Sequence, residues 1–205
     1  MLRYVTTNPG KVLEARARLP AVEQLDFDYP EIQSPDLGPI AAAGARAAYR
    51  HVDAPVLVDD AGLFVAGFDG FPGPYSSFVE TTVGVEAVGR LCARELDEMD
   101  ASFRCVLGYC DGTDLDAPHG EGGENDTHAP RVDDGDGDSL PVVLFEGVVD
   151  GQIVSPRGSG GFGYDPIFEV AGATYAEMSP GDKTADSNRG QAIDTFAAWH
   201  AARSW

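Results

Sequence analysis

Hydrophobic and polar positions alternate along this chain in blocks that predict short strands separated by helices. Apolar runs and period-two alternation predict strands at residues 2–6, 25–29, 56–58, 103–110 and 142–149. Apolar residues at helical spacing predict helices at residues 11–19, 40–52, 83–99 and 191–205. Because strands and helices alternate, the pattern predicts an α/β fold.

Glycine, proline and aromatic residues interrupt the pattern at three places. Residues 62–79 predict a long structured loop, and residues 158–163 predict a glycine-rich loop. Asp150 and Gly151 predict a hairpin turn before a short strand at 152–154.

Residues 111–138 differ from the rest of the chain in composition. They hold ten acidic side chains, one arginine and six glycines, for a net charge of −9. Such a segment cannot bury enough apolar surface to offset the entropy lost on ordering. We therefore expect an acidic flexible insertion that serves solubility, within a single domain over residues 1–205.

The charge of the whole chain excludes several classes of partner. With 34 acidic and 14 basic side chains the net charge is −20, which repels nucleic acid. No apolar run approaches the roughly 20 residues of a membrane span, and no signal pattern opens the chain. Three cysteines without zinc-type spacing predict free thiols in the cytoplasm. The Asp-rich, Lys-poor composition is typical of proteins that stay soluble in high salt.

Residues 6–11, Thr-Thr-Asn-Pro-Gly-Lys, are the first candidate site. A strand, a turn and a helix start present free N–H groups to an anion, and Lys11 adds a charge. The alternative is an ordinary Asn-Pro-Gly turn with Asn8 as the helix cap, since the P-loop spacing is absent.

Asp59 and Asp60 follow the strand at 56–58, where open α/β sheets bind ligands. Successive strand residues point to opposite faces, so at most one of the pair faces a site. Mg²⁺ often takes one or two carboxylates together with substrate phosphates, and Glu31 is a second candidate ligand. The alternative is a solvated acidic edge.

Two later motifs suit a planar ring and its phosphates. In residues 160–166, glycines permit close approach, Phe162 or Tyr164 can stack, and Asp165 can accept hydrogen bonds from ring N–H groups. The alternative is a tight turn with packed aromatic residues. Residues 178–190 bring Lys183, Asn188 and Arg189 near one helix start, where Ser187 is alternatively a plain cap. The chain has only two lysines, Lys11 and Lys183, and both fall in these motifs, which favours a functional role for both.

Six segments taken together resemble the inosine triphosphate pyrophosphatase family. They occur in the family's order and are residues 6–11, 30–33, 58–63, 70–77, 160–168 and 174–190. The resemblance implies an elongated mixed β-sheet with flanking helices, two lobes around a nucleotide-binding cleft, and a homodimer. It also implies Mg²⁺-dependent hydrolysis of ITP, dITP and XTP to the nucleoside monophosphate and pyrophosphate.

The resemblance assigns roles residue by residue. Glu31 and Asp60 would bind Mg²⁺, and Asp60 would orient or deprotonate the attacking water, with Lys11 as the second catalytic residue. The substrate-binding residues would be Thr6, Thr7, Asn8, Lys11, Ala61, Phe162, Gly163, Tyr164, Asp165, Lys183, Asn188 and Arg189. Asn188 stands where the family has histidine, so one alternative is an enzyme with broadened base specificity. Another is an inactive nucleotide-binding protein.

Overall fold

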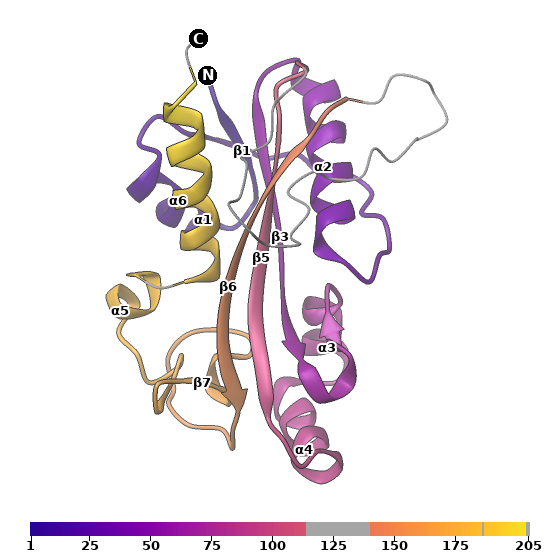
Figure 1. The fold of residues 1–205 in the computed structure, drawn as a ribbon, viewed down its shortest axis with the longest axis vertical. Helices are drawn as coiled ribbons and strands as arrows, with labels where there is room; N and C mark the ends of the chain where they lie inside the picture. Colours follow the sequence, from indigo (N-terminus) through magenta and orange to yellow (C-terminus); the bar gives the residue numbers. More distant parts are fainter. Residues whose placement is uncertain (114–139, 186, 204–205) are drawn as a thin grey trace. The chain divides into compact units, whose positions relative to one another are not determined.

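The structure, a computed structural model, describes residues 1–113, 140–185 and 187–203 (Figure 1). From residue 114 onward, the expected acidic insertion lies outside the described residues. Among the helices that are described, none is both long and apolar enough to span a bilayer.

Within the described residues, eight strands form one mixed sheet, which confirms the α/β class. Their bounds are Arg3–Val5 (β1), Glu23–Leu25 (β2), Val56–Val65 (β3), Pro72–Gly73 (β4), Asp100–Cys110 (β5), Val143–Ile153 (β6), Phe168–Val170 (β7) and Ala173–Thr174 (β8). The strand order is β2-β1-β3-β5-β6-β7-β8, and β4 pairs with β3. β1 runs parallel to β2 and β3, whereas β4 is antiparallel to β3 and β7 is antiparallel to β6 and β8.

The helices and two short 3₁₀ turns connect these strands. They are Pro9–Arg18 (α1), Leu37–Val52 (α2), Ser76–Thr82 (α3), Val85–Glu95 (α4), Pro180–Ala185 (α5), Asn188–Ala201 (α6), Ala66–Phe68 (η1) and Asp165–Ile167 (η2). The chain divides into two compact units. The first contains residues 1–60, 106–146 and 189–205, and the second contains residues 61–105 and 147–188.

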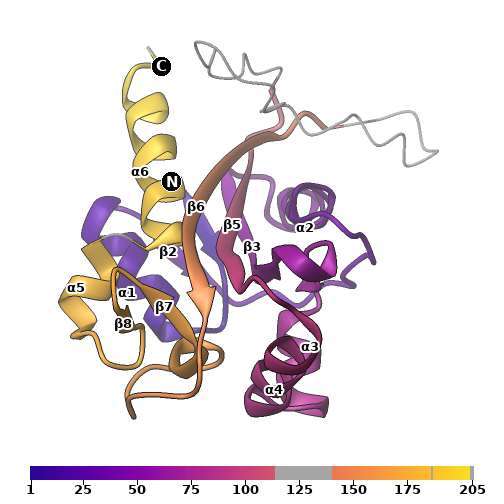
Figure 2. The same cartoon turned by 60° about the horizontal axis from the view of Figure 1, so that its bottom comes forward.

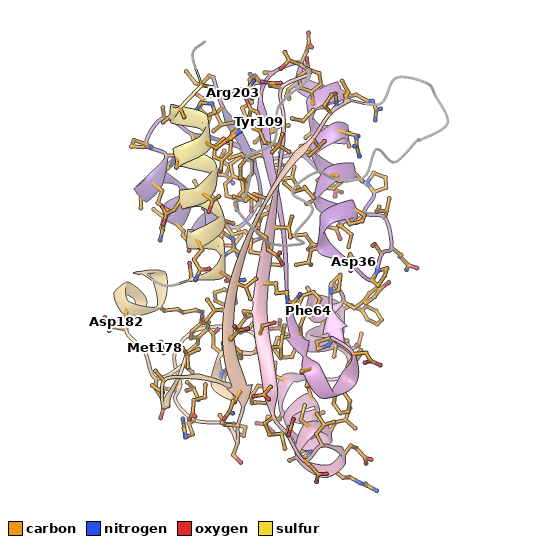
Figure 3. The ribbon with its side chains drawn as sticks, viewed as in Figure 1. Asp36, Phe64, Tyr109, Met178, Asp182 and Arg203 are labelled. Carbon is orange, nitrogen blue, oxygen red and sulfur yellow. The ribbon has the colours of Figure 1, made fainter. Side chains whose placement is uncertain are left out.

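In the first unit, helices cover both faces of the strands. α1 and α6 lie on one side and α2 lies on the other (Figure 1). Tyr109 of β5 packs under α6, with ring centroids 5.2 Å from Phe196 and 5.5 Å from Trp199 (Figure 3). Trp199 in turn lies under the guanidinium of Arg203 at 4.7 Å. This aromatic cluster packs the second half of α6 against β5.

In the second unit, a separate core forms around Phe168, whose ring centroid lies 4.6 Å from Phe103 and 5.1 Å from Tyr175. α3 and α4 lie next to each other (Figure 2). Ser76 fastens the start of α3 to β3, because its buried Oγ accepts a hydrogen bond from the Leu63 N–H at 2.8 Å. Ser76 of the 70–77 segment therefore serves the packing of this unit.

The structure corrects three expectations about element bounds. The expected strand at 25–29 is wrong, because β2 ends at Leu25 and Phe27 instead stacks on His51 with ring centroids 4.2 Å apart. The expected loop at 62–79 is wrong as well, because β3 extends into it as far as Val65 and α3 begins within it at Ser76. α2 begins three residues early, since proline is tolerated in a first helical turn.

The expected hairpin at Asp150 and Gly151 is also wrong, because β6 runs unbroken to Ile153. The glycine serves a different purpose. A Cβ at Gly151 would lie 2.4 Å from the carbonyl oxygen of Glu169. Glycine is required there so that β7 can approach closely.

Candidate active site

The turn between β1 and α1 is built by short polar side chains. Thr6 Oγ1 accepts a hydrogen bond from the Asn8 N–H at 3.1 Å, and Asn8 Oδ1 accepts one from the Gly10 N–H at 2.8 Å. Asn8 therefore caps α1, as the alternative interpretation predicted, and Pro9 is the first helical residue. Thr7 and Asn8 are exposed at this positively polarised helix end.

A buried carboxylate lies next to this turn. Asp59 of β3 has a side chain that is 1% exposed, and its Oδ2 is 3.0 Å from Lys11 Nζ and 3.1 Å from Arg189 Nε. Its Oδ1 accepts a hydrogen bond of 2.6 Å from the Tyr4 hydroxyl. Arg189 also pairs with Glu14 at 3.2 Å. One carboxylate thus gathers groups from β1, α1 and α6 of the first unit.

The ionisation of Asp59 follows from these partners. Burial alone would raise the pKa of this carboxyl group, but the charges of Lys11 and Arg189 and the hydrogen bond from Tyr4 outweigh it and hold the pKa well below its ordinary value. Asp59 is therefore an anion at neutral pH.

Three carboxylates act on a single phenol in the first unit. The pKa of Tyr29 is raised above its ordinary value, first by burial and then by the negative charges of Glu31, Asp59 and Asp60. The Tyr29 ring is held against α2 at Gly44, where a Cβ would lie 2.5 Å from the phenol oxygen. This packing fixes the segment that carries Glu31.

Glu31 and Asp60 fit the chemistry of a hard divalent cation. Two carboxylates suffice where water and substrate phosphates supply the other oxygen ligands, which is how Mg²⁺ is often bound. Among the residues that the structure describes, no group of three or more His, Cys, Asp or Glu side chains has the geometry of a metal site.

The second unit holds a similar pairing of lysine with a buried carboxylate. Asp165, which is 2% exposed, accepts hydrogen bonds from the Phe162 N–H at 2.8 Å and from Lys183 Nζ at 2.5 Å. The same ammonium lies 4.5 Å from the ring centroid of Phe162 and 5.1 Å from that of Tyr175. Phe162 itself is 70% exposed, so one face of its ring is available to a planar ligand.

The glycine-rich loop of residues 158–163 is shaped to fit Asp165. Gly161 has a φ of 73°, and a Cβ there would lie 2.0 Å from Asp165 Oδ2. Gly158 has a φ of 77° and passes close to the backbone of Ala176. Glycine is needed at both positions, because another residue would push the loop away from the carboxylate.

The remaining expected site residues have different surroundings. Tyr164 is 3% exposed, and its hydroxyl donates a hydrogen bond of 2.9 Å to the Ser76 carbonyl, so its ring belongs to the core of the second unit. Burial raises the pKa of Tyr164 to about 12. Gly163 is adjacent to it at a φ of 58°. Ala61 follows Asp60 along β3, and Asn188 is the first residue of α6.

Comparison with known proteins shows the family to which this chain belongs. The model of the Ham1 family matches residues 2–199. A dITP/XTP pyrophosphatase of Methanosarcina mazei is 40% identical over 202 residues, which cover 96% of this chain and 95% of that protein. The chain belongs to the Ham1 family. A dITP/XTP pyrophosphatase of Thermococcus kodakarensis is also 40% identical, over 97% of this chain and 96% of that protein.

The fold of a solved Ham1 relative agrees with that of this chain. The structure of a HAM1 protein from Coxiella burnetii matches with a TM-score of 0.76 at 28% identity, covering 99% of this chain and 100% of that one. The Ham1 family thus accounts for the mixed sheet with flanking helices that the resemblance implied.

Several residues of the site were not predicted. Of the adjacent Asp59 and Asp60, the sequence predicts a role only for Asp60, although Asp59 is the one that holds Lys11 and Arg189. Tyr4 and Glu14 carry no recognisable signal, because their contacts with residues 59 and 189 depend entirely on the tertiary fold. The scarcity of lysine did point to Lys11 and Lys183, but it gave no sign of the carboxylates that pair with them.

The packing of Tyr29 on α2 gives a stability prediction. An alanine inside a helix is ordinarily more stable than glycine by roughly 0.5–1 kcal/mol. In Gly44→Ala the new methyl group would overlap the Tyr29 ring, so we expect the free energy of unfolding to fall by about 1–3 kcal/mol. Urea denaturation measures this change.

The matched control is Gly89→Ala in α4. Its Cβ would lie 3.5 Å from Ile167 Cγ2, an ordinary contact, so we expect unchanged or slightly higher stability. Equal effects of the two substitutions would show that Tyr29 is not held by Gly44.

Proposed function

We propose that this Ham1 family member hydrolyses ITP, dITP and XTP to the nucleoside monophosphate and pyrophosphate, and so removes non-canonical purine nucleotides from the nucleotide pool. The supporting observation is the ionised Asp59, which holds Lys11 and Arg189 together beside the start of α1. The relatives named dITP/XTP pyrophosphatase support the substrate class.

Cleavage of a phosphoanhydride requires the protein to position the substrate and neutralise its charge more than to form covalent bonds with it. In this proposal Thr6, Thr7, Asn8 and Lys11 bind the triphosphate at the start of α1, where the helix dipole adds to the charge of lysine. Arg189 adds a second cation that its two carboxylate partners keep in place.

Glu31 and Asp60 are the proposed ligands of Mg²⁺. The bound ion would neutralise charge on the phosphate oxygens. Asp60 orients the attacking water and accepts its proton, which requires a carboxylate that is ionised when the substrate binds.

The base is assigned to residues of the second unit. Phe162 stacks on the purine ring with its exposed face. Asp165 accepts hydrogen bonds from ring N–H groups at Oδ1, because its Oδ2 already accepts from the Phe162 N–H and Lys183 Nζ. Lys183, Asn188 and the backbone of Ala61 and Gly163 complete the proposed contacts. The buried Tyr164 would act by supporting the loop that carries Phe162.

The product identity tests this proposal. The chain is incubated with Mg²⁺ and each of ITP, dITP, XTP, GTP, ATP and dTTP at high salt, and the released phosphorus species are separated. We expect pyrophosphate from the first three substrates and little turnover of the others. Release of orthophosphate alone would contradict the bond assignment.

The substitution Asp60→Asn, measured in the same assay, tests the proposed role of Asp60 as proton acceptor. The amide cannot accept the proton of water, so we expect turnover to fall at least ~100-fold while the protein stays folded. Asp150→Asn, an exposed carboxylate on β6, is the matched control and is expected to retain full activity. Nucleotide binding without any metal-dependent product in the unmodified chain would favour an inactive nucleotide-binding protein instead.

Asn188 motivates a second candidate, an enzyme with broadened base specificity. Asparagine at the start of α6 has a shorter reach than the histidine of the resemblance. We expect Asn188→His to raise the ratio of XTP to GTP turnover roughly tenfold, the size of one hydrogen bond. Gln191→His, one turn along the same helix, is the control, and a similar change there would remove Asn188 from base recognition.

The remaining proposals concern the setting in which the enzyme works. We propose a cytoplasmic, salt-adapted homodimer, in keeping with the family resemblance, the charge of −20 and three cysteines that are buried free thiols. Light scattering tests the dimer and thermal unfolding tests the salt adaptation, each across a range of KCl concentrations. A monomer at all salt concentrations would contradict the dimer, and a melting temperature that falls as salt rises would contradict salt adaptation.

A further inference from the structure

The buried carboxylate of Asp59 contacts two cations through one oxygen atom, so it can fix their positions as well as neutralise charge. One oxygen, Oδ2, contacts both Lys11 Nζ at 3.0 Å and Arg189 Nε at 3.1 Å. Because both nitrogens contact Oδ2, Lys11 Nζ and Arg189 Nε must lie close to each other. Asp59 therefore sets the spacing of two cations that come from residues 178 positions apart in the chain.

The other contacts of this cluster fix the carboxylate itself. The Tyr4 hydroxyl donates to Oδ1 at 2.6 Å, so Asp59 is held at both oxygens and cannot rotate without losing a bond. Arg189 is held from a second side by Glu14 Oε2 at 3.2 Å. Lys11 keeps 26% of its side chain exposed, whereas Asp59 is covered. The carboxylate is thus placed to orient the lysine from behind and not to meet a ligand.

The charges of these four side chains argue against a site that serves only to attract a polyanion. Lys11 and Arg189 are matched by Asp59 and Glu14, so this cluster carries no net charge. A site that only collected phosphate would gain from losing Asp59, because both cations would then be uncompensated. Keeping the carboxylate makes sense where the placement of the cations matters more than their total charge.

We propose that Asp59 is a positioning residue of the reaction, which holds the Lys11 ammonium and the Arg189 guanidinium at a fixed spacing so that both engage the polyphosphate of one substrate. This inference rests on the proposed function, because it assumes that a nucleoside triphosphate binds at the start of α1. Asp59 itself does not touch the reacting atoms.

The test compares three variants by steady-state kinetics with dITP and Mg²⁺, normalised to the folded fraction. Asp59→Asn keeps the shape and removes the charge, and Asp59→Glu keeps the charge but moves it one methylene outward. Tyr4→Phe removes the third donor and leaves both ion pairs intact. We expect kcat to fall roughly 100-fold in both Asp59 variants, the size of a small misplacement of a charged group, and by no more than about tenfold, the size of one hydrogen bond, in Tyr4→Phe.

The KM separates positioning from a purely structural role. With the cations uncompensated, Asp59→Asn is expected to show an unchanged or lower KM for dITP together with its low kcat. The Mg²⁺ concentration for half-maximal rate should stay within threefold of the unmodified chain, because Asp60 and Glu31 are untouched. If Asp59→Asn does not fold, Asp59→Glu carries the test by itself.

Three results would overturn the inference. They are a kcat within threefold of the unmodified chain in a folded Asp59 variant, an equal loss in Tyr4→Phe, and a large shift in the Mg²⁺ requirement. Failure of the proposed function is distinguishable, because the unmodified chain would then release no pyrophosphate from dITP. In that case, inorganic tripolyphosphate binding measured by calorimetry still tests the cluster, and unchanged affinity and enthalpy in Asp59→Asn would reject it.

Discussion

A buried carboxylate is costly unless cations and hydrogen bonds surround it, and the first unit of this chain is organised around meeting that requirement at Asp59. Taking one ion out of water costs several kcal/mol after relaxation, and a single missing partner leaves that cost uncompensated. Lys11, Arg189 and Tyr4 supply the partners from three elements. The cap of α1, the depth of β3 and the aromatic packing under α6 all serve to bring these groups to one place.

The second unit repeats the arrangement with different parts. Asp165 is buried, Lys183 pairs with it, and a glycine-rich loop closes over the carboxylate. In both units the lysine is only partly covered, while its carboxylate is almost fully covered. Each pair therefore presents a cation of fixed direction to solvent. A chain with only two lysines and a charge of −20 uses both of them in this way.

Much of the fold could be predicted from the sequence, and the wrong predictions of a hairpin and a strand have physical reasons. The α/β class, the position of most helices and the placement of both lysines in turn-flanked motifs follow from periodicity, turn residues and composition. The hairpin expected at Gly151 failed because glycine can equally serve a close approach of strands, which local pattern does not distinguish from a turn. The strand expected at 25–29 failed because packing of Phe27 on His51 overrides the local alternation.

In the candidate site, too, residues in short local motifs were easier to predict than residues whose contacts depend on the tertiary fold. Asn8, Lys11, Asp165 and Lys183 lie in short motifs whose chemistry is readable from neighbouring residues. Asp59 acquires its role only from partners that are distant in the chain, so its motif indicated a pair of aspartates without showing which one meets the cations. Sequence motifs thus pointed to the partly exposed lysines better than to the buried Asp59 that holds Lys11.

The central claim is that the two paired lysines are the ones that meet the nucleotide. Because the chain has no other lysine, selective ¹⁵N labelling of lysine gives one side-chain ammonium signal for each. The account predicts that a non-hydrolysable α,β-methylene analogue of dITP, added with Mg²⁺, shifts both signals to saturation at the same ligand concentration. A Lys11 signal that stays unmoved while the analogue binds would contradict it.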